Sequence, residues 1–107
     1  MAFIELRQYV IKPGQMQAWL KLFHDEILPF QVGKGMLITG IYRGETDDSV
    51  FVWTRRFESE AEREALYKAV YEDPHWKNSI SPRVGECIDR PSIKVQRITA
   101  TKLSPTQ

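Results

Sequence analysis

Residues 2–12 read AFIELRQYVIK, and Pro13–Gly14 follows them directly. Successive side chains of a β-strand point to opposite faces, so a stretch with apolar residues at alternating positions is typical of a strand. Proline cannot donate to a strand ladder and glycine tolerates turn geometry, so this pair should end the strand. The sequence therefore predicts a strand over residues 2–12 that leads straight into a turn.

The residues after this turn predict one helix and then two paired strands. In residues 15–28 the apolar side chains recur three and four positions apart, which is typical of one face of a helix. We expect Pro29 to end that helix, because the residue before a proline is disfavoured in α geometry. Residues 36–43 and 50–57 each alternate, and the polar segment 44–49 between them predicts a hairpin turn.

A second helix is predicted to begin after Ser59. Ser59 and Glu62 have the spacing of a capping box, in which each side chain accepts a backbone N–H of the first turn. This helix should continue to about Tyr71. Asp73–Pro74 then has the pattern of a cap followed by proline at the first helical position, so a short third helix should open there and end at Pro82.

The order of these elements predicts the fold. Residues 85–91 form a connection, and residues 92–102 alternate again as a fourth strand. The order β-α-β-β-α-β is that of the ferredoxin-like fold, with four antiparallel strands in one sheet and both helices on one face. We expect one α+β domain over residues 1–103 and a loose tail over residues 104–107.

The strands carry large apolar residues on both faces, which predicts a dimer. Two helices can cover only one face of the sheet, so a monomer should alternate cleanly between apolar and polar residues. Instead, the first strand sets Ile4, Leu6 and Val10 against Phe3, Tyr9 and Ile11. If this face were uncovered, it would be a larger apolar patch than soluble monomers usually expose. We expect a second copy to cover it about a two-fold axis, giving a homodimer or a larger assembly of dimers.

Composition excludes several classes of function. The chain has 107 residues and a net charge of +1, with no basic stripe of the kind that nucleic-acid binding needs. Its only cysteine, Cys87, excludes an intrachain disulfide and paired-cysteine redox or zinc sites. No apolar stretch approaches the roughly 20 residues of a membrane span, and no signal pattern is present. We therefore expect a cytoplasmic protein with no membrane and no nucleic-acid partner.

The first strand also resembles the start of a known family. Glu5-Leu6-Arg7-Gln8-Tyr9 followed by Lys12-Pro13-Gly14 resembles the opening of the NIPSNAP domain. Further matches follow in order: Leu28-Pro29 with Gln31, Gly40 and Tyr42, Trp53, Arg63, and Asp73-Pro74 before Trp76. The resemblance implies the dimeric α/β-barrel superfamily, in which two ferredoxin-like sheets pack face to face. That superfamily includes cofactor-free aromatic monooxygenases, haem-handling enzymes and stress-response proteins, so the fold alone selects no activity.

One face of the first and third strands concentrates charged and aromatic residues, and this predicts a pocket. The residues are Glu5, Arg7 and Tyr9 of the first strand and Phe51, Trp53 and Arg55 of the third. Arg7 or Arg55 would hold an anionic group of a ligand, while Tyr9 and Trp53 would form an aromatic wall. The alternative is a structural network in which Glu5 simply pairs with the arginines. We expect this mixed face to lie beneath the helices, where pockets of the superfamily usually lie.

Three further residues are weaker candidates. His24 is a candidate general base together with Glu5 and Tyr9, although a histidine late in a helix is often satisfied by the last carbonyls. His75 and Trp76 begin the short helix and are candidates for the mouth of the pocket. The two histidines lack metal-ligand spacing and no nucleotide-binding motif is present, so we expect no metal and no cofactor.

Two functions are compatible with these patterns. The first is a dimeric protein that binds a small aromatic or acidic molecule, with a cofactor-independent oxygenase-like reaction as its enzymatic form. The second is a non-catalytic interaction or scaffold module, in which the charged and aromatic face only builds the barrel. A cavity lined by Glu5 and Arg7 would favour the first function, and complete pairing of these charges would favour the second.

Overall fold

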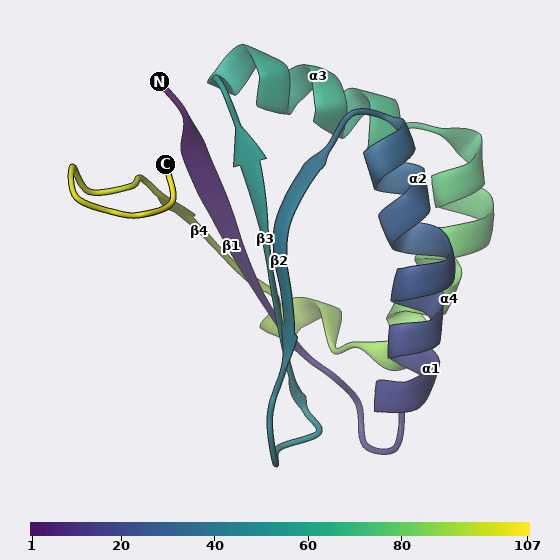
Figure 1. Ribbon diagram of the computed structural model, residues 1–107. Coiled ribbons are helices and arrows are strands. Elements are labelled where there is room, and N and C mark those ends of the chain that lie inside the picture. Colours follow the sequence, from purple (N-terminus) through teal and green to yellow (C-terminus); the bar gives the residue numbers. More distant parts are fainter.

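The chain folds into a four-stranded antiparallel sheet with its helices packed on one face (Figure 1). The computed structural model describes residues 1–107. The strands are β1 (Phe3–Val10), β2 (Leu37–Arg43), β3 (Val50–Phe57) and β4 (Lys94–Ile98), in the spatial order β2-β3-β1-β4. The central strands are therefore β1 and β3, and the predicted β-α-β-β-α-β order of a ferredoxin-like fold is confirmed.

The register of β1 and β3 decides which side chains share a face. Glu5 lies opposite Arg55, Arg7 opposite Trp53, and Tyr9 opposite Phe51. Because residues opposite each other point to the same side, all six belong to one face. That face meets the helices, as expected for the mixed face. The first strand ends at Val10 rather than at residue 12, and an isolated bridge between Ile11 and Ile88 continues its line.

Pro29 does not end the first helix, so that prediction was wrong. The helix runs without interruption through α1 (Met16–Leu22), the π-helical turn η1 (Phe23–Ile27) and α2 (Leu28–Gly33), which has Pro29 in its first turn. A proline inside an α-helix lacks an N–H and its ring clashes with the carbonyl four residues earlier. A π-helical turn widens the backbone just before the ring, which relieves the clash and lets the helix continue for another turn.

The same arrangement recurs in the second half of the chain. Helix α3 (Glu60–Tyr71) begins as predicted, with the Ser59 hydroxyl accepting from the Glu62 N–H at 3.1 Å. After the Asp73 cap, the π-helical turn η2 (Trp76–Ile80) leads into α4 (Ser81–Cys87), which has Pro82 in its first turn. The predicted break at Pro82 was therefore wrong.

The segment between α4 and the last strand also differs from the prediction. The predicted connection over residues 85–91 begins as the last turn of α4 and continues into the short 3₁₀ turn η3 (Arg90–Ser92). The last strand covers only residues 94–98 of the predicted 92–102.

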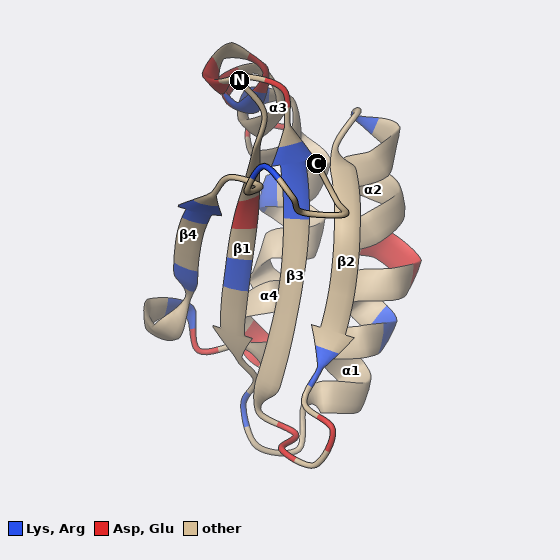
Figure 2. Ribbon diagram, turned by 60° about the vertical axis from the view of Figure 1, so that its left-hand side comes forward, with Lys and Arg blue, Asp and Glu red and all other residues tan.

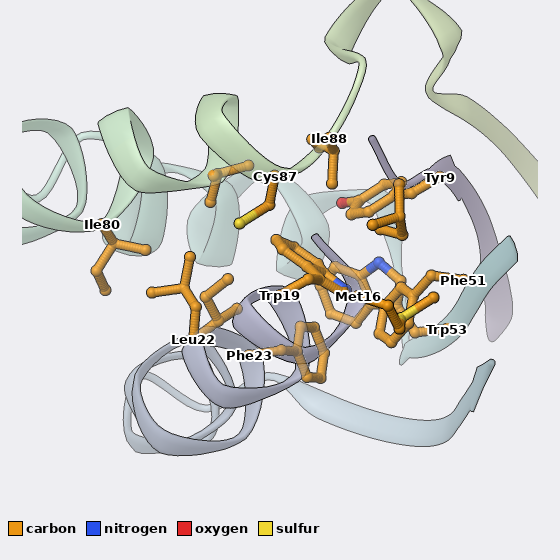
Figure 3. Packing of buried hydrophobic residues seen from close by; sticks show 13 residues of the cluster. Tyr9, Met16, Trp19, Leu22, Phe23, Phe51, Trp53, Ile80, Cys87 and Ile88 are labelled. Atoms are coloured by element: carbon orange, nitrogen blue, oxygen red, sulfur yellow. The ribbon is translucent and has the colours of Figure 1, made fainter. Parts of the chain in front are cut away.

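The core lies between the inner face of the sheet and the helices. Figure 3 shows the rings of Tyr9, Trp19, Phe23, Phe51 and Trp53 gathered there. Several of these rings meet edge to face, with centroids 5.1 Å apart for Phe23 and Trp53 and 5.4 Å apart for Trp19 and Phe51. A smaller cluster of Phe3, Met36, Phe57 and Val70 continues the core toward α3.

No helix covers the outer face of the sheet. In Figure 2 the strands lie in front and the helices behind them, and only the C-terminal segment crosses the outer face. This face carries large apolar residues that are substantially exposed, namely Val10, Leu37, Tyr42, Val50 and Ile98. None of the helices is long and apolar enough to cross a lipid bilayer.

Candidate functional site

A buried ion pair between the two central strands organises the inner face of the sheet. Arg55 on β3 is fully buried and donates to Glu5 Oε1 on β1 at 2.8 Å through Nη2 and at 3.2 Å through Nε. The second oxygen of Glu5, Oε2, accepts from the Tyr67 hydroxyl at 2.6 Å. The carboxylate therefore has partners on both oxygens, as a buried charge requires.

Arg55 has protein partners for all of its donors. Its remaining N–H groups donate to Gln31 Oε1 at 3.0 Å, to the Tyr71 hydroxyl at 2.8 Å and to the Tyr67 hydroxyl at 3.0 Å. A guanidinium has five N–H donors, and these contacts use every one of them. Arg55 is thus a structural cation that ties β3 to α2 and α3.

Arg7 is different, because part of its guanidinium has no protein partner. Its Nε donates to the Tyr9 hydroxyl at 3.1 Å, and its Nη1 lies 3.3 Å from the Tyr67 hydroxyl and 3.6 Å from Glu5 Oε1. Its Nη2 makes no hydrogen bond within the chain, although the side chain is only 12% exposed. The guanidinium also lies 5.6 Å from the ring centroids of both Tyr9 and Trp53, within cation–π range.

A cavity of about 140 Å³ adjoins Arg7, between the sheet and the helices. Its polar lining comes from Arg7, Gln31 and Arg90. Its aromatic lining comes from Tyr9, Trp19, Phe23, Trp53, Tyr71 and Trp76. No aspartate or glutamate lines it. The cavity therefore combines flat apolar walls with a few polar groups, which is the usual make-up of a small-molecule site.

Three buried N–H donors on residues that line this cavity have no hydrogen-bond partner within the chain. They are the indole Nε1 atoms of Trp19 and Trp53 and the amide Nε2 of Gln31, and each residue is at most 1% exposed. Native proteins satisfy most buried polar groups, and leaving one unpaired costs about 1–3 kcal/mol. All three belong to residues that line the same cavity, which points to a molecule bound there as their common partner.

Tyr9 and Tyr67 stay protonated at neutral pH. Burial raises the pKa of Tyr9, although the neighbouring Arg7 opposes this effect. Burial also raises the pKa of Tyr67 to about 12, against the opposing charge of Arg55. For Arg7, burial lowers the pKa, but the oxygens of Tyr9 and Tyr71 outweigh it and the net pKa is above its ordinary value. The site therefore holds two guanidinium cations and neutral phenols.

Comparison with known proteins identifies the family. The NIPSNAP family model matches residues 4–105, nearly the whole chain. The chain belongs to the NIPSNAP family. No curated protein matches it.

Solved structures of other NIPSNAP proteins have the same fold. A NIPSNAP family protein of Agrobacterium tumefaciens superposes with a TM-score of 0.90 at 24% identity, over 100% of both chains. A second one from that organism, described as having unknown function, gives a TM-score of 0.89 at 24% identity, over 99% of this chain and 94% of that one. A Nitrosomonas europaea protein, named provisionally as an antibiotic biosynthesis monooxygenase, gives a TM-score of 0.71 at 13% identity, over 96% and 93% of the chains. At these sequence identities the structural similarity supports a shared fold and says nothing about function.

The structure divides the predicted site residues of this NIPSNAP chain into groups. Arg7, Tyr9, Trp53 and Trp76 line the cavity. Glu5 and Arg55 lie on the same face of the sheet but do not line it, because they are engaged with each other and with the tyrosines. The predicted pairing of Glu5 with the arginines is confirmed for both Arg55 and Arg7.

The two histidines lie outside the cavity of this NIPSNAP protein. His24 is exposed on η1, where it contacts the edge of Phe23. His75 is also exposed, and its ring packs 5.5 Å from that of Phe30. No three His, Cys, Asp or Glu side chains gather in the chain in a way that could hold a metal ion.

Among the lining residues that sequence reasoning missed, Trp19, Gln31 and Arg90 carry N–H donors. Trp19 fitted the apolar face of a helix, and its unpartnered N–H is visible only in three dimensions. Gln31 stood in a presumed loop, since the helix was expected to end at Pro29. The polar Gln31 on an otherwise apolar helix face was the available signal, and it carries both a bond to Arg55 and a free donor.

Proposed function

We propose that this NIPSNAP protein binds a small aromatic or acidic molecule in the cavity beneath its helices. The observation that supports the proposal is that three residues with an unpartnered buried donor and one partly unpartnered arginine line the same cavity. A ligand with acceptor atoms would satisfy these groups, and the aromatic walls would contact its flat faces.

The scaffold function accounts for only part of the site. Complete pairing of Glu5 and Arg55 is what a structural network requires, and these two residues fit that role. It does not account for Arg7, Trp19 and Trp53, whose free donors would each lower stability without a ligand. An oxygenase-like reaction stays a prediction, because the likeness to a protein named for such chemistry carries the fold alone.

A cavity-filling variant tests the proposal. Val84 lines the cavity from α4 and is buried, so Val84→Phe should fill part of the space. Ligand-observed NMR with a panel of small aromatic and acidic compounds should detect binding to the unmodified protein and its loss in this variant. Val32→Phe is the matched control, because Val32 is 51% exposed on α2 and does not line the cavity.

Circular dichroism and thermal unfolding should accompany each measurement, so that loss of binding is separated from loss of fold. If Val84→Phe unfolds, Ile93→Phe fills the cavity from another segment. Equal binding by Val84→Phe, Ile93→Phe and the control would contradict the cavity as the site.

We also propose that a second copy covers the outer face of the sheet. Leu6 and Val52 lie at its centre and are half-buried without a helix over them. Tyr42, opposite Val52, is 60% exposed, and Leu37 at the other end of β2 is 52% exposed. A contiguous apolar face of this kind is typical of an interface. A two-fold arrangement would satisfy both copies with the same surface.

Sedimentation measurements test the dimer. The unmodified protein should sediment as a dimer, and Val52→Asp should sediment as a folded monomer because its carboxylate would be buried at the interface. Val32→Asp introduces the same charge on α2, on the helix side of the sheet rather than its outer face, and should leave the dimer intact. A monomer for the unmodified protein at about 100 μM, a concentration far above the Kd of a standard-sized specific interface, would contradict the proposal.

A further inference from the structure

The charges around the cavity of this NIPSNAP protein do not balance. The buried network contains two guanidinium groups, Arg7 and Arg55, and one carboxylate, Glu5. Glu5 accepts every one of its hydrogen bonds and donates none, as an ionised carboxylate does. No carboxylate lines the cavity itself. The two cations share this one carboxylate, so the network carries an excess positive charge next to the cavity, and a buried excess charge is costly.

The hydrogen-bonding groups around the cavity also favour a negatively charged ligand. Arg55 uses up the acceptors around it: the carbonyl oxygen of Gln31 and the hydroxyl of Tyr71 both accept from its Nη1. Gln31 is thereby oriented with its NH₂ group as the free end. The Tyr9 hydroxyl likewise accepts from Arg7 Nε and donates to no protein group.

The unpartnered buried polar atoms of the residues that line the cavity are therefore all N–H donors. The free donors are the indoles of Trp19 and Trp53, the amide of Gln31 and the Nη2 of Arg7. A ligand that only accepts hydrogen bonds matches this set, whereas an amine or an amide NH₂ would face donors with donors.

The size and the walls of the cavity limit the rest of the ligand. An engineered apolar protein cavity of about 150 Å³ takes up benzene, so about 140 Å³ has room for a single six-membered ring. Ring faces and edges from Trp19, Phe23 and Trp53 surround it. These walls favour a flat, conjugated body over a branched or heavily hydroxylated one.

We infer that the ligand is a monocyclic aromatic carboxylate, bound as the anion with its carboxylate toward Arg7 and its ring between the tryptophans. The inference rests on the proposed binding function and names the class of ligand for that site. A carboxylate accepts hydrogen bonds and donates none, so it complements both the cation of Arg7 and the unpartnered N–H donors of the lining residues.

Benzoate and its neutral isosteres test the inference. Binding of benzoate, benzamide and toluene to the unmodified protein is measured by titration calorimetry and by quenching of tryptophan fluorescence. We expect benzoate to bind about tenfold more tightly than benzamide, because a hydrogen bond to a charged partner contributes more than a neutral one. Toluene should bind more weakly still, since it satisfies none of the donors.

A variant then assigns the preference to Arg7. Arg7→Met keeps the length and apolar stem of the side chain but removes the cation, so benzoate should bind about tenfold more weakly while toluene binding is unchanged. Arg43→Met is the matched control, because Arg43 is 40% exposed and pairs only with Asp48 at the surface. The order of the three affinities is measured on the unmodified protein alone, so it tests the carboxylate inference even if Arg7→Met fails to fold.

The outcomes separate the two claims. If benzamide or toluene binds as tightly as benzoate, and Val84→Phe abolishes that binding, the cavity is a binding site but the carboxylate inference is overturned. If none of the three compounds binds at millimolar concentration, both the inference and the proposed function lose their support. If benzoate is preferred but Arg7→Met folds and leaves that preference intact, the assignment to Arg7 is wrong.

Discussion

Arg55 on β3 and Glu5 on β1 lie directly opposite each other in the sheet, with Arg55 Nη2 2.8 Å from Glu5 Oε1 and both side chains buried. The pair sits between two apolar clusters, one around Trp53 and one around Phe57, and the guanidinium contacts both rings. Taking two charges out of water is costly, and the pair is tolerated because tyrosine and glutamine side chains complete its hydrogen bonds. The ion pair thus joins the sheet to the helices that form the wall of the cavity.

Removing one partner of this pair should destabilise the protein strongly. Arg55→Met leaves the Glu5 carboxylate buried with only the more distant Arg7 as a cation, 3.6 Å away. We expect a loss of about 3–5 kcal/mol in the free energy of unfolding, measured by urea denaturation. A loss below about 1 kcal/mol, the usual size for an exposed pair, would contradict the buried network.

The double variant Glu5→Met/Arg55→Met is the control for this measurement. It removes both charges together, so its loss should be smaller than the sum of the two single losses by about 1–3 kcal/mol. Additive losses would mean that the two side chains do not interact in the folded protein.

The sequence predicted the sheet face of the site better than the helix side. The two-residue period of a strand places Arg7 and Tyr9 on one face of β1, and the register with β3 adds Trp53 to that face. The cavity is lined by all three. Arg7 and Arg55 look alike in the sequence. Their different roles come from α3, whose tyrosines lie close enough to use all the donors of Arg55 but leave one end of Arg7 free.

The helix side could not be predicted because two prolines behave against the usual rule. Pro29 and Pro82 are each the second residue after a π-helical turn, η1 and η2, and each helix continues past its proline. A π-helical turn has no sequence signature of the kind that caps and turns have, so proline was taken as a stop. The consequence was that Gln31 was assigned to a loop, although it faces the cavity from α2.

The raised pKa of the Tyr67 hydroxyl predicts that the protein loses stability at high pH. Burial raises its pKa to about 12 in the folded protein, against about 10 in an unfolded chain. The folded state therefore favours the protonated phenol, so its contribution is complete below pH 10 and is lost as the pH rises toward 12. We expect the free energy of unfolding to fall by about 1–2 kcal/mol across this interval, less than the full two-unit value because Tyr67 is only partly buried.

Tyr67→Phe separates this effect from other alkaline changes. The variant loses the bonds from Tyr67 to Glu5 and the arginines, so it should be less stable than the unmodified protein at pH 7. Its further decline between pH 10 and pH 12 should be smaller, as measured by urea denaturation at each pH. A decline as steep as that of the unmodified protein would assign the effect to other groups, such as the buried Tyr9.

The start of α3 should depend on the Ser59 cap. Ser59 Oγ accepts from the Glu62 N–H, and the Glu62 carboxylate accepts from the Glu58 N–H at 3.0 Å. Ser59→Ala leaves the Glu62 N–H without its partner, and we expect a loss of about 1 kcal/mol in thermal or urea unfolding. Ser59→Asp restores an acceptor at the same position and should recover most of that stability. Equal losses for both variants would show that the cap contributes nothing.

The ring of Tyr42 covers Gly40 on β2, so replacing Gly40 by alanine should not give the gain in stability that is usual inside a strand. A Cβ atom at Gly40 would lie 2.6 Å from Tyr42 Cε2, so Gly40→Ala forces the ring away from the outer face of the sheet. A glycine inside a strand normally costs about 0.5–1 kcal/mol relative to alanine, because it gives up more backbone freedom on folding. In the unmodified protein, loss of the ring contact should offset that gain and leave Gly40→Ala neutral or destabilising.

In a Tyr42→Ala background the same substitution should stabilise the protein by about 0.5 kcal/mol in urea unfolding. If Gly40→Ala has the same effect in both backgrounds, the packing of Tyr42 on Gly40 does not contribute to stability.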